Sequence, residues 1–321
     1  MPHVLIAGTL HPAGIALVEA AEGVTFDYVE DGTAAAFLPY LPVAEGLVIR
    51  TQPLTAAAIA GAPRLRVVSR HGVGFDAVDV AALTARGVPL AIVGDANARA
   101  VAEHAMALIL ACAKDLRRMD AAVRAGDWAA RDGYGGVELG GRRLLILGYG
   151  RSGRALARLA AAFGMAVEAF DPFAEPLAPE EPARRAQDLG AALGAADVVS
   201  VHAPKGARAI LGAAEIAAMK PGAILVNCAR GGVVDEVALA AALRSGRIAA
   251  AGLDVFGAEP PDAGDPLLAA PNVVASPHVA GVAREARERM ALRAVGNVLD
   301  FFAGRLDPAL VVNPEVLEAA R

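Results

Sequence analysis

The chain has 321 residues, of which 55% are hydrophobic and 20% charged. This composition provides for a large folded core and excludes wholesale disorder, and the length favours two domains over one. The 30 basic and 35 acidic residues give a formal net charge of −5. A nucleic-acid or anionic-membrane surface needs excess positive charge, so neither is expected as the main function.

The cysteine content argues against a disulfide framework. Cys112 and Cys228 are the two cysteines, too few for a Cys-rich metal site, and we expect no bound metal. The N-terminal run Met1–Gly8 lacks the basic region of a signal peptide, and no stretch approaches 18 uninterrupted apolar residues. These features predict a soluble protein of the reducing cytoplasm.

In the first hundred residues, short apolar runs alternate with Ala-rich stretches of helical composition. Such alternation predicts a parallel sheet covered by helices. A long and mostly buried helix is expected next, from about Asn97 to Ala113. The predicted strands are Val4–Ala7, Thr25–Val29, Leu47–Ile49, Leu65–Ser69 and Leu90–Val93, with helices at Pro12–Ala21 and Val80–Arg86.

The alternation then restarts, which indicates a second α/β unit. Its apolar runs are continuous, as in parallel strands buried on both faces. The predicted strands are Leu144–Leu147, Val167–Phe170, Val198–Val201, Ile224–Val226, Ala249–Leu253 and Val273–Ala275. The predicted helices are Arg151–Phe163, Ala213–Met219, Asp235–Ser245 and Arg284–Phe302. Seams between the units are expected near Gly94–Asn97 and just before the last long helix.

A glycine-rich segment, Gly148-Tyr149-Gly150-Arg151-Ser152-Gly153, lies between a predicted strand and a predicted helix. In a dinucleotide site, Gly148 would permit the tight turn, Gly150 would let a pyrophosphate approach the backbone, and Gly153 would let helix and strand pack closely. The helix N-terminus adds unpaired N–H groups for the phosphates. The alternative is an ordinary glycine turn, but the strand–turn–helix context favours the dinucleotide site.

Asp171 follows the next strand, 18 residues after Gly153. Its carboxylate would accept hydrogen bonds from the adenosine ribose hydroxyls. A 2′-phosphate beside it would cost about 1 to 4 kcal/mol, so NAD is favoured over NADP by a factor of order 10 to 10³. The alternative role is a turn-forming Asp before Pro172.

Three further strand ends carry Arg230, Glu259 and His278. Ligands of doubly wound sheets bind outside the carboxyl ends of the strands, so these side chains can converge. An Arg can hold the carboxylate of a 2-oxo acid, a His can donate a proton to the carbonyl oxygen, and a carboxylate beside the His can stabilise the imidazolium. Taken singly, Arg230 and Glu259 would more often form surface ion pairs and His278 a buried hydrogen bond, but their joint placement after a nucleotide-binding fold favours a site.

These segments together resemble the D-isomer-specific 2-hydroxyacid dehydrogenase family, which includes phosphoglycerate dehydrogenase and glyoxylate/hydroxypyruvate reductases. Ser69–Asp79 resembles the substrate loop of that family, and Asn97–His104 resembles the start of its interdomain helix. The resemblance implies two doubly wound parallel-sheet α/β domains, with a Rossmann NAD-binding domain (98–283) inserted into a flavodoxin-like substrate domain (1–97 plus 284–321).

The resemblance also implies roles for individual residues and a homodimer, for which Trp128 and the surrounding arm are candidates. The implied catalytic residues are Arg230, Glu259 and His278. The implied cofactor-binding residues are Gly148, Gly150, Arg151, Ser152, Gly153, Asp171, His202, Pro204, Cys228, Ala229 and Asp254. The implied substrate-binding residues are Arg50, Gly72, Val73 and Gly74.

The sequence therefore predicts reversible NADH-dependent reduction of a small 2-oxo acid to the D-2-hydroxy acid. Formate oxidation is a rival of similar chemistry, but Glu259 argues against it because relatives with that activity pair their His with Gln. A different alternative is an NADH-sensing, co-repressor-like binding protein without significant turnover. His104 is expected to be a satisfied core or hinge residue, whereas for His71 substrate contact and loop packing are equally expected.

Overall fold

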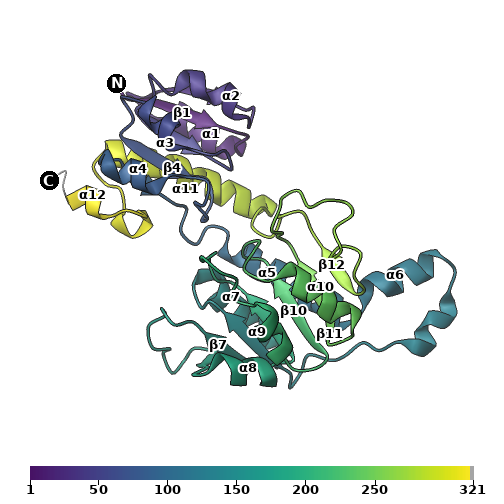
Figure 1. The fold of residues 1–321 in the computed structure, drawn as a ribbon. Helices are drawn as coiled ribbons and strands as arrows, with labels where there is room; N and C mark the ends of the chain where they lie inside the picture. Colours follow the sequence, from purple (N-terminus) through teal and green to yellow (C-terminus); the bar gives the residue numbers. More distant parts are fainter. Residues whose placement is uncertain (319–321) are drawn as a thin grey trace. The chain divides into compact units, whose positions relative to one another are not determined.

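The computed structural model describes residues 1–318 and divides into two compact units. Unit 1 comprises Met1–Asn97 and Val282–Arg321, and unit 2 comprises Ala98–Gly281. Each unit is an α/β domain built on its own sheet (Figure 1). The second unit is therefore inserted into the chain of the first.

Unit 1 contains a five-stranded sheet in the order β2-β1-β3-β4-β5, and all its strand pairs are parallel. This is the flavodoxin-like doubly wound order, as the sequence predicts. The strands are β1 (His3–Ala7), β2 (Thr25–Val29), β3 (Gly46–Ile49), β4 (Val67–Arg70) and β5 (Leu90–Ala91). The helices are α1 (Pro12–Glu19), α2 (Ala34–Phe37), α3 (Ala56–Ala60), α4 (Val80–Ala85), α11 (Arg284–Phe302) and α12 (Glu315–Glu318).

Both faces of this sheet are buried. Helix α11 supplies Val295 and Val298 to one apolar cluster, together with Val48 of the sheet. Leu47, the neighbour of Val48 in β3, points to the other face and joins Phe37 in a second cluster. The C-terminal segment packs on the same unit, where the Asn313 side chain accepts a 2.8 Å hydrogen bond from the Leu90 amide.

Unit 2 contains a seven-stranded parallel sheet in the order β12-β11-β10-β9-β6-β7-β8. The chain order reverses between β6 and β9, which makes the Rossmann switch point. The strands are β6 (Arg143–Leu147), β7 (Ala166–Phe170), β8 (Ala183–Arg185), β9 (Val198–Val201), β10 (Ala223–Asn227), β11 (Ile248–Leu253) and β12 (Val273–Ala275). The helices are α5 (Ala98–Ala113), α6 (Leu116–Arg124), α7 (Arg151–Ala162), α8 (Leu189–Ala195), α9 (Ala213–Ala218) and α10 (Glu236–Arg244).

Several elements of the structure differ from the sequence expectations. Strand β5 ends at Ala91, two residues before the predicted end, and β8 was not predicted because its sequence, Ala-Arg-Arg, has no apolar run. Helix α6 was also missed, since none of its side chains is buried and a core-facing stripe is the usual signal of a helix. Figure 1 shows that α6 extends away from the sheet of unit 2.

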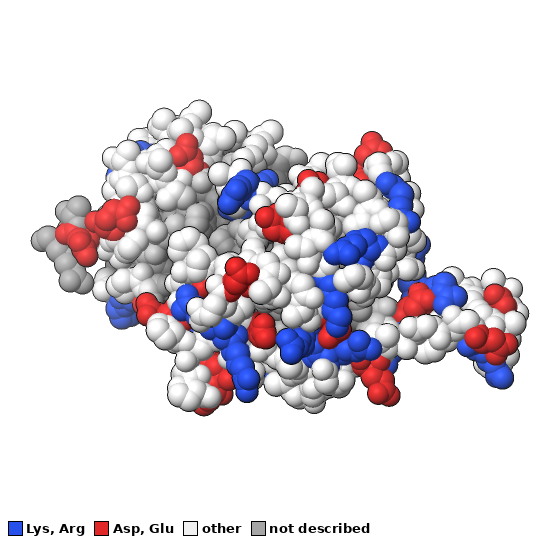
Figure 2. Space-filling view, turned by 60° about the horizontal axis from the view of Figure 1, so that its bottom comes forward, with Lys and Arg blue, Asp and Glu red and all other residues white. Residues whose placement is uncertain are grey.

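The surface carries both signs of charge. In Figure 2 the basic and acidic side chains of the visible face are intermixed among uncharged ones. Within residues 1–318, none of the helices has the length and apolar character needed to cross a bilayer. The cytoplasmic location stays a prediction.

Candidate active site

The glycine-rich turn joins β6 to α7 at the switch point of the unit 2 sheet. Gly148 has φ +91°, and a Cβ there would lie 2.7 Å from the backbone N of Ala203. A Cβ on Gly153 would lie 2.3 Å from the Gly148 carbonyl oxygen, whereas one on Gly150 would meet nothing within 4 Å. The turn is therefore closely packed on two sides and open at Gly150, where α7 begins, which fits a pyrophosphate against the helix N-terminus.

Asp171 lies directly after β7, beside this turn. Its Oδ2 accepts a hydrogen bond from the Tyr149 amide (2.8 Å), and its Oδ1 accepts one from the Phe173 amide (2.9 Å). The two roles considered from the sequence are thus compatible. Two backbone amides fix the carboxylate, and each oxygen keeps a lone pair that a ribose hydroxyl can use.

A Tyr–Glu–Arg cluster packs against the same turn. The Tyr149 hydroxyl donates to Glu181 (2.9 Å), and Glu181 also pairs with Arg154 of α7. The Arg154 guanidinium lies 4.8 Å from the centre of the Tyr149 ring. Burial, with the adjacent Glu181 carboxylate, raises the pKa of Tyr149 to about 12, so the hydroxyl remains a donor. The cluster was not predicted, because Glu181 lies 32 residues from Tyr149 in the chain.

His202, predicted as a cofactor residue, follows β9. Its ring nitrogens lie 3.0 Å from the Ser200 hydroxyl and 3.1 Å from the Ser152 hydroxyl. Burial lowers the pKa of His202 to about 4, so the imidazole is neutral at physiological pH. The His202 ring therefore connects the end of β9 to the first turn of α7. Arg151 and Pro204, two other predicted cofactor residues, are exposed.

The Asn227 side chain shapes the turn that carries Arg230. Its Oδ1 accepts from the Ala229 amide (3.0 Å), and its Nδ2 donates to the Arg230 carbonyl (2.9 Å). Asn227 is the last residue of β10 and is buried. Asn227 was not predicted as a site residue, although an Asn whose oxygen accepts from the amide two residues later is a typical turn former. Cys228 is buried within the turn, and burial raises the pKa of its thiol far above the usual range.

The Arg230 turn packs directly against the segment that carries Glu259. A Cβ on Gly231 would lie only 1.7 Å from the Phe256 carbonyl oxygen, so glycine is required at this contact. The Phe256 amide donates to Glu259 Oε1 (3.1 Å) and holds that carboxylate in place. Strands β10 and β11 therefore bring the Arg230 and Glu259 segments together.

His278 and Glu259 form a hydrogen-bonded pair. His278 Nδ1 lies 2.7 Å from Glu259 Oε2, although the residues follow different strands, β12 and β11. A carboxylate can only accept, so Nδ1 carries the proton of this hydrogen bond. The other ring nitrogen, Nε2, is left to exchange a proton with a ligand.

Asp254 is fully buried directly after β11. Its carboxylate accepts hydrogen bonds from the Ser276 hydroxyl (2.6 Å) and from the amides of Val279 (2.9 Å) and Ala280 (2.8 Å). These donors lie on both sides of His278 in the chain. Asp254 therefore holds the segment 276–280, and its predicted contact with a nicotinamide stays a prediction.

The predicted substrate residues lie in unit 1, after β3 and β4. The Arg50 guanidinium donates to the Thr9 carbonyl (3.1 Å), and the Arg50 amide donates to the buried Gln52 side chain (3.1 Å). Gly72 has φ +152°, and a Cβ there would lie 2.7 Å from Nη1 of Arg70. The Gly72–Gly74 loop thus has a guanidinium packed directly against it.

His71 is buried between these arginines. Burial, followed by the nearby charges of Arg50 and Arg70, lowers the pKa of His71 to about 4. Among the described residues, its buried Nε2 has no hydrogen-bond partner. Burial, with the charge of Arg287, also lowers the pKa of Arg50. This end of the unit 1 sheet therefore concentrates positive charge around a neutral imidazole.

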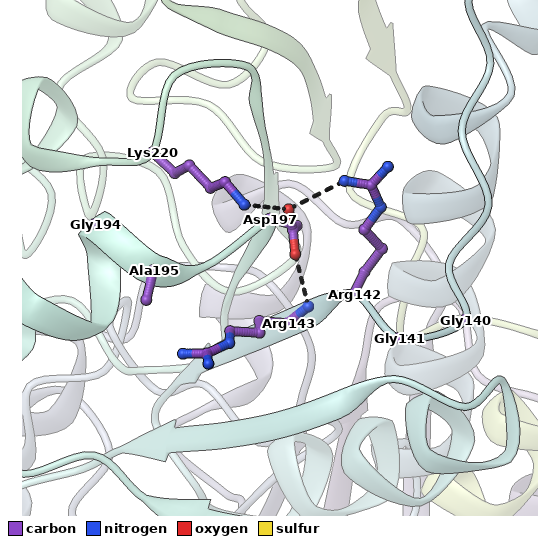
Figure 3. A pocket seen from close by; sticks show the side chains of 8 residues that line it. All are labelled: Gly140, Gly141, Arg142, Arg143, Gly194, Ala195, Asp197 and Lys220. Atoms are coloured by element: carbon purple, nitrogen blue, oxygen red, sulfur yellow. Dashed lines mark hydrogen bonds and ion pairs between the residues drawn. The ribbon is translucent and has the colours of Figure 1, made fainter.

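A separate hollow of about 560 Å³ lies at the opposite edge of the unit 2 sheet (Figure 3). There Asp197 accepts from Lys220 (2.8 Å), from the Arg142 guanidinium (3.3 Å) and from the Arg143 amide (2.8 Å). These residues precede or begin β6, β9 and β10, so they lie at the amino ends of the strands. Ligands of such sheets bind at the carboxyl ends, and we assign a structural role to these ion pairs.

The glycine turn, the Asp after β7 and the switch point define a dinucleotide-binding α/β protein. The family model for the "D-isomer specific 2-hydroxyacid dehydrogenase, NAD binding domain" matches residues 106–280. The chain belongs to this family, and unit 2 is its NAD-binding domain.

Similar proteins agree with this assignment. The chain is 38% identical over 325 residues to D-3-phosphoglycerate dehydrogenase of Mycobacterium leprae, in a match that covers 98% of this chain. It spans only 61% of the length of that relative. The crystal structure of the TT0316 protein from Thermus thermophilus is 36% identical, with a TM-score of 0.86 and coverage of 97% of this chain and 99% of the other. D-lactate dehydrogenase from Aquifex aeolicus, solved with NAD and lactic acid, is 27% identical, with a TM-score of 0.86 and the same coverage.

Proposed function

We propose that the protein catalyses the NAD-dependent interconversion of a small 2-oxo acid and the corresponding D-2-hydroxy acid. The 2.7 Å pair between His278 and Glu259 is the observation that carries this proposal. The pair lies on the same sheet as the glycine-rich turn, in a chain of the 2-hydroxyacid dehydrogenase family. An NADH-sensing protein without turnover would not need a proton-transfer pair, so that alternative is not favoured.

In the direction of reduction, a nicotinamide held by unit 2 would supply the hydride for the carbonyl carbon of the substrate. His278 donates the proton at Nε2 to the carbonyl oxygen, which completes the hydroxyl group. Glu259 accepts from Nδ1 and so orients the imidazole and stabilises its charged form. Arg230 binds the substrate carboxylate through its planar guanidinium, and the Asn227 side chain fixes the turn from which Arg230 extends.

The cofactor contacts follow from the turn and the strand ends of unit 2. Gly148, Gly150 and Gly153, with Arg151 and Ser152, would hold the pyrophosphate, and Asp171 would bind the adenosine ribose. We propose NAD over NADP because the Asp171 carboxylate would repel a 2′-phosphate. The end of β9 and the turn after β10 would contact the remainder of the dinucleotide, through His202, Pro204, Cys228, Ala229 and Asp254.

We further propose that the substrate carries a second negative charge, as a phosphorylated or dicarboxylic 2-oxo acid does. The repulsion between Arg50 and Arg287, close to neutral His71, supports this, because a bound anion would relieve it. The backbone of Gly72, Val73 and Gly74 would bind the carboxylate. The name of the Mycobacterium leprae relative, D-3-phosphoglycerate dehydrogenase, agrees with a phosphorylated substrate.

The experiment that tests this function is NADH oxidation, followed by absorbance, against a panel of 2-oxo acids. Glyoxylate, hydroxypyruvate and pyruvate carry one negative charge, whereas 2-oxoglutarate and phosphohydroxypyruvate carry more. We expect turnover with at least one acid and a preference for the second group, and NADPH in place of NADH should be a poor donor. Binding of NADH, measured by fluorescence, without turnover on any acid would overturn the proposal in favour of a sensor.

We also propose a homodimer formed through the arm that contains α6 and Trp128. Trp128 is 68% exposed, and the side chains of Leu116 and Val123 on α6 are more than half exposed. Apolar side chains gathered on a projecting segment are typical of a protein interface. Sedimentation of the wild type should give a dimer, and Trp128→Ser combined with Val123→Ser should shift it toward the monomer. A monomeric wild type would rule out this part of the proposal.

A further inference from the structure

A chain of three side chains begins on α5 and ends next to the proposed catalytic histidine. His104 Nε2 lies 2.8 Å from the Ser276 hydroxyl oxygen, and that hydroxyl lies 2.6 Å from Asp254 Oδ1. His104 is 172 residues away from Ser276 in the sequence. Because all three residues belong to unit 2, the geometry of the chain is set within one compact unit.

The direction of each hydrogen bond follows from the chemistry of the acceptor. The Asp254 carboxylate can only accept, so the Ser276 hydroxyl donates its single hydrogen to Asp254. The oxygen of Ser276 must then accept from His104, which places a proton on Nε2 of His104. The hydrogen bonds therefore run from His104 to Ser276 to Asp254, and each polarises the next. His104 Nε2 also lies 3.6 Å from Asp254 Oδ1, beyond hydrogen-bond distance.

The chain ends at the segment that holds His278. Asp254 also accepts from the amides of Val279 and Ala280. The His278 amide donates to the Asp254 carbonyl (2.8 Å) and to the Ser276 carbonyl (3.1 Å). This arrangement keeps His278 at φ +54°, a left-handed conformation that is rare outside glycine. A strained conformation persists only where its surroundings over-determine it.

We infer that His104 and Ser276 are positioning residues for the proposed oxidoreductase reaction, acting through Asp254 on the backbone at His278. The inference rests on the proposed role of His278 as acid/base. His104 fixes the proton of the Ser276 hydroxyl toward Asp254, and Asp254 in turn holds the amides that follow His278. The Nδ1 contact of His278 with Glu259 depends on this backbone because Glu259 is anchored separately, at Phe256.

A positioning role of His104 can be distinguished from a purely structural one, because other hydrogen bonds also hold the segment 276–280. Removal of His104 should weaken the hydrogen bonds of the Val279 and Ala280 amides to Asp254 without abolishing them, so the fold and the glycine-rich turn should survive. What changes is the precision with which His278 is held. A small misplacement of a reacting group lowers kcat far more than it lowers cofactor affinity.

The test uses two substitutions at His104 and one neighbouring control in the full-length protein. His104→Leu removes the donor, His104→Gln retains an N–H donor, and Glu103→Gln changes an adjacent exposed residue. We expect His104→Leu to lower kcat roughly 10–100-fold, with the dissociation constant of NADH changed by less than about twofold. His104→Gln should recover most of the activity, and Glu103→Gln should match the wild type.

A double-mutant cycle tests whether the residues act in one chain. Ser276→Ala should lower kcat to a similar extent, and His104→Leu combined with Ser276→Ala should be no worse than Ser276→Ala alone. Multiplying effects would mean that the two residues act separately and would overturn the inference. Wild-type kcat in His104→Leu would also overturn it, as would a failure of His104→Gln to rescue together with a fall in Tm.

Amide hydrogen exchange tests the same chain without any turnover. In the substrate-free protein, His104→Leu should speed exchange at Val279 and Ala280 by about tenfold, with the core strands unchanged. Unchanged exchange at these amides would overturn the inference even if the enzyme is active. If instead His278→Asn retains full turnover, the proposed function fails, and the exchange result still decides whether the chain holds the segment.

Discussion

The carboxyl edges of the two sheets differ in their chemistry, although both sheets are parallel and doubly wound. In unit 2 this edge carries the His278–Glu259 pair and carboxylates anchored by backbone amides, at Asp171 and Asp254. In unit 1 the carboxyl edge carries Arg50 and Arg70 near the buried, neutral imidazole of His71. One architecture therefore supports two kinds of site.

Under the proposed function, the two sheet edges have different tasks. Proton transfer needs a donor and a partner carboxylate held at hydrogen-bond distance, which unit 2 provides within a single sheet edge. Recognition of an anion needs fixed positive charge, a role that the proposal gives to the arginines of unit 1. Substitutions in unit 2 should therefore change the rate for every substrate, and substitutions in unit 1 should change the choice of substrate.

The largest effect is expected from His278→Asn in unit 2. Loss of the proton donor should lower kcat by about 10²–10⁴-fold, because general acid–base groups typically contribute this much. NADH binding, measured by fluorescence, should be unchanged. His3→Asn, a substitution in unit 1 at a residue that contacts Thr25 and Asp27, is the matched control. Near-full activity of His278→Asn would contradict the account.

Asp171→Asn should weaken the choice between cofactors. Removing the carboxylate charge should raise kcat/KM with NADPH relative to NADH by about 10 to 10³-fold. Asn keeps an oxygen acceptor for one of the two amides at Asp171, so the turn should survive. The ratio of the two kcat/KM values is the measurement, and an unchanged ratio would show that cofactor choice lies elsewhere.

Two substitutions in the glycine-rich turn should have different effects, one on stability and the other on NADH binding. Gly148→Ala should lower stability by at least about 1–2 kcal/mol, since φ is +91° and the new Cβ meets the backbone of Ala203. Gly150→Ala has open space around its Cβ and should keep the wild-type Tm, but weaken NADH binding by roughly tenfold because the pyrophosphate approaches there. Equal effects of both substitutions on Tm and on NADH binding would contradict the proposed pyrophosphate site at Gly150.

Acidification should lower stability through one histidine of each unit. The pKa of His71 and of His202 is about 4, below the ordinary 6.5, so the unfolded chain takes up protons first as the pH falls. Each residue should cost about 2 kcal/mol of stability between about pH 7.5 and about pH 5. The carboxyl pKa of Asp197 is lowered from 3.8, so its own loss of stability comes at lower pH.

Substitution of each histidine checks this sign. The fall in Tm on acidification should be smaller in His71→Gln and in His202→Gln than in the wild type. A wild type that is equally stable across this range of pH would show that the two imidazoles are not held neutral.

Much of the fold could be predicted because its signals are local. Continuous apolar runs mark the buried strands, and the Gly148–Gly153 spacing marks the switch point. Helix α6 and β8 escaped prediction because neither presents an apolar pattern to a core. Their place depends on neighbours that are distant in the sequence.

The residues of the site could be predicted from the sequence, but several of the hydrogen bonds between them could not. Arg230, Glu259 and His278 are recognisable at strand ends, but nothing local indicates that His104 bonds to Ser276, 172 residues away. The sequence also could not predict that His71 is only 6% exposed or that its Nε2 lacks a hydrogen-bond partner among the described residues. Both depend on how Arg50, Arg70 and α11, which carries Arg287, pack around it. Sequence patterns identify which groups are present, whereas tertiary packing decides their partners.

The most direct test of the different tasks of the two sheet edges is one ratio, kcat/KM for phosphohydroxypyruvate over kcat/KM for hydroxypyruvate. We predict that Arg50→Gln lowers this ratio by roughly tenfold or more, because it removes a positive charge that the proposal assigns to binding the substrate phosphate. Glu259→Gln should lower both kcat/KM values and leave their ratio unchanged. A ratio that moves with Glu259→Gln, or that stays constant in Arg50→Gln, would contradict the account.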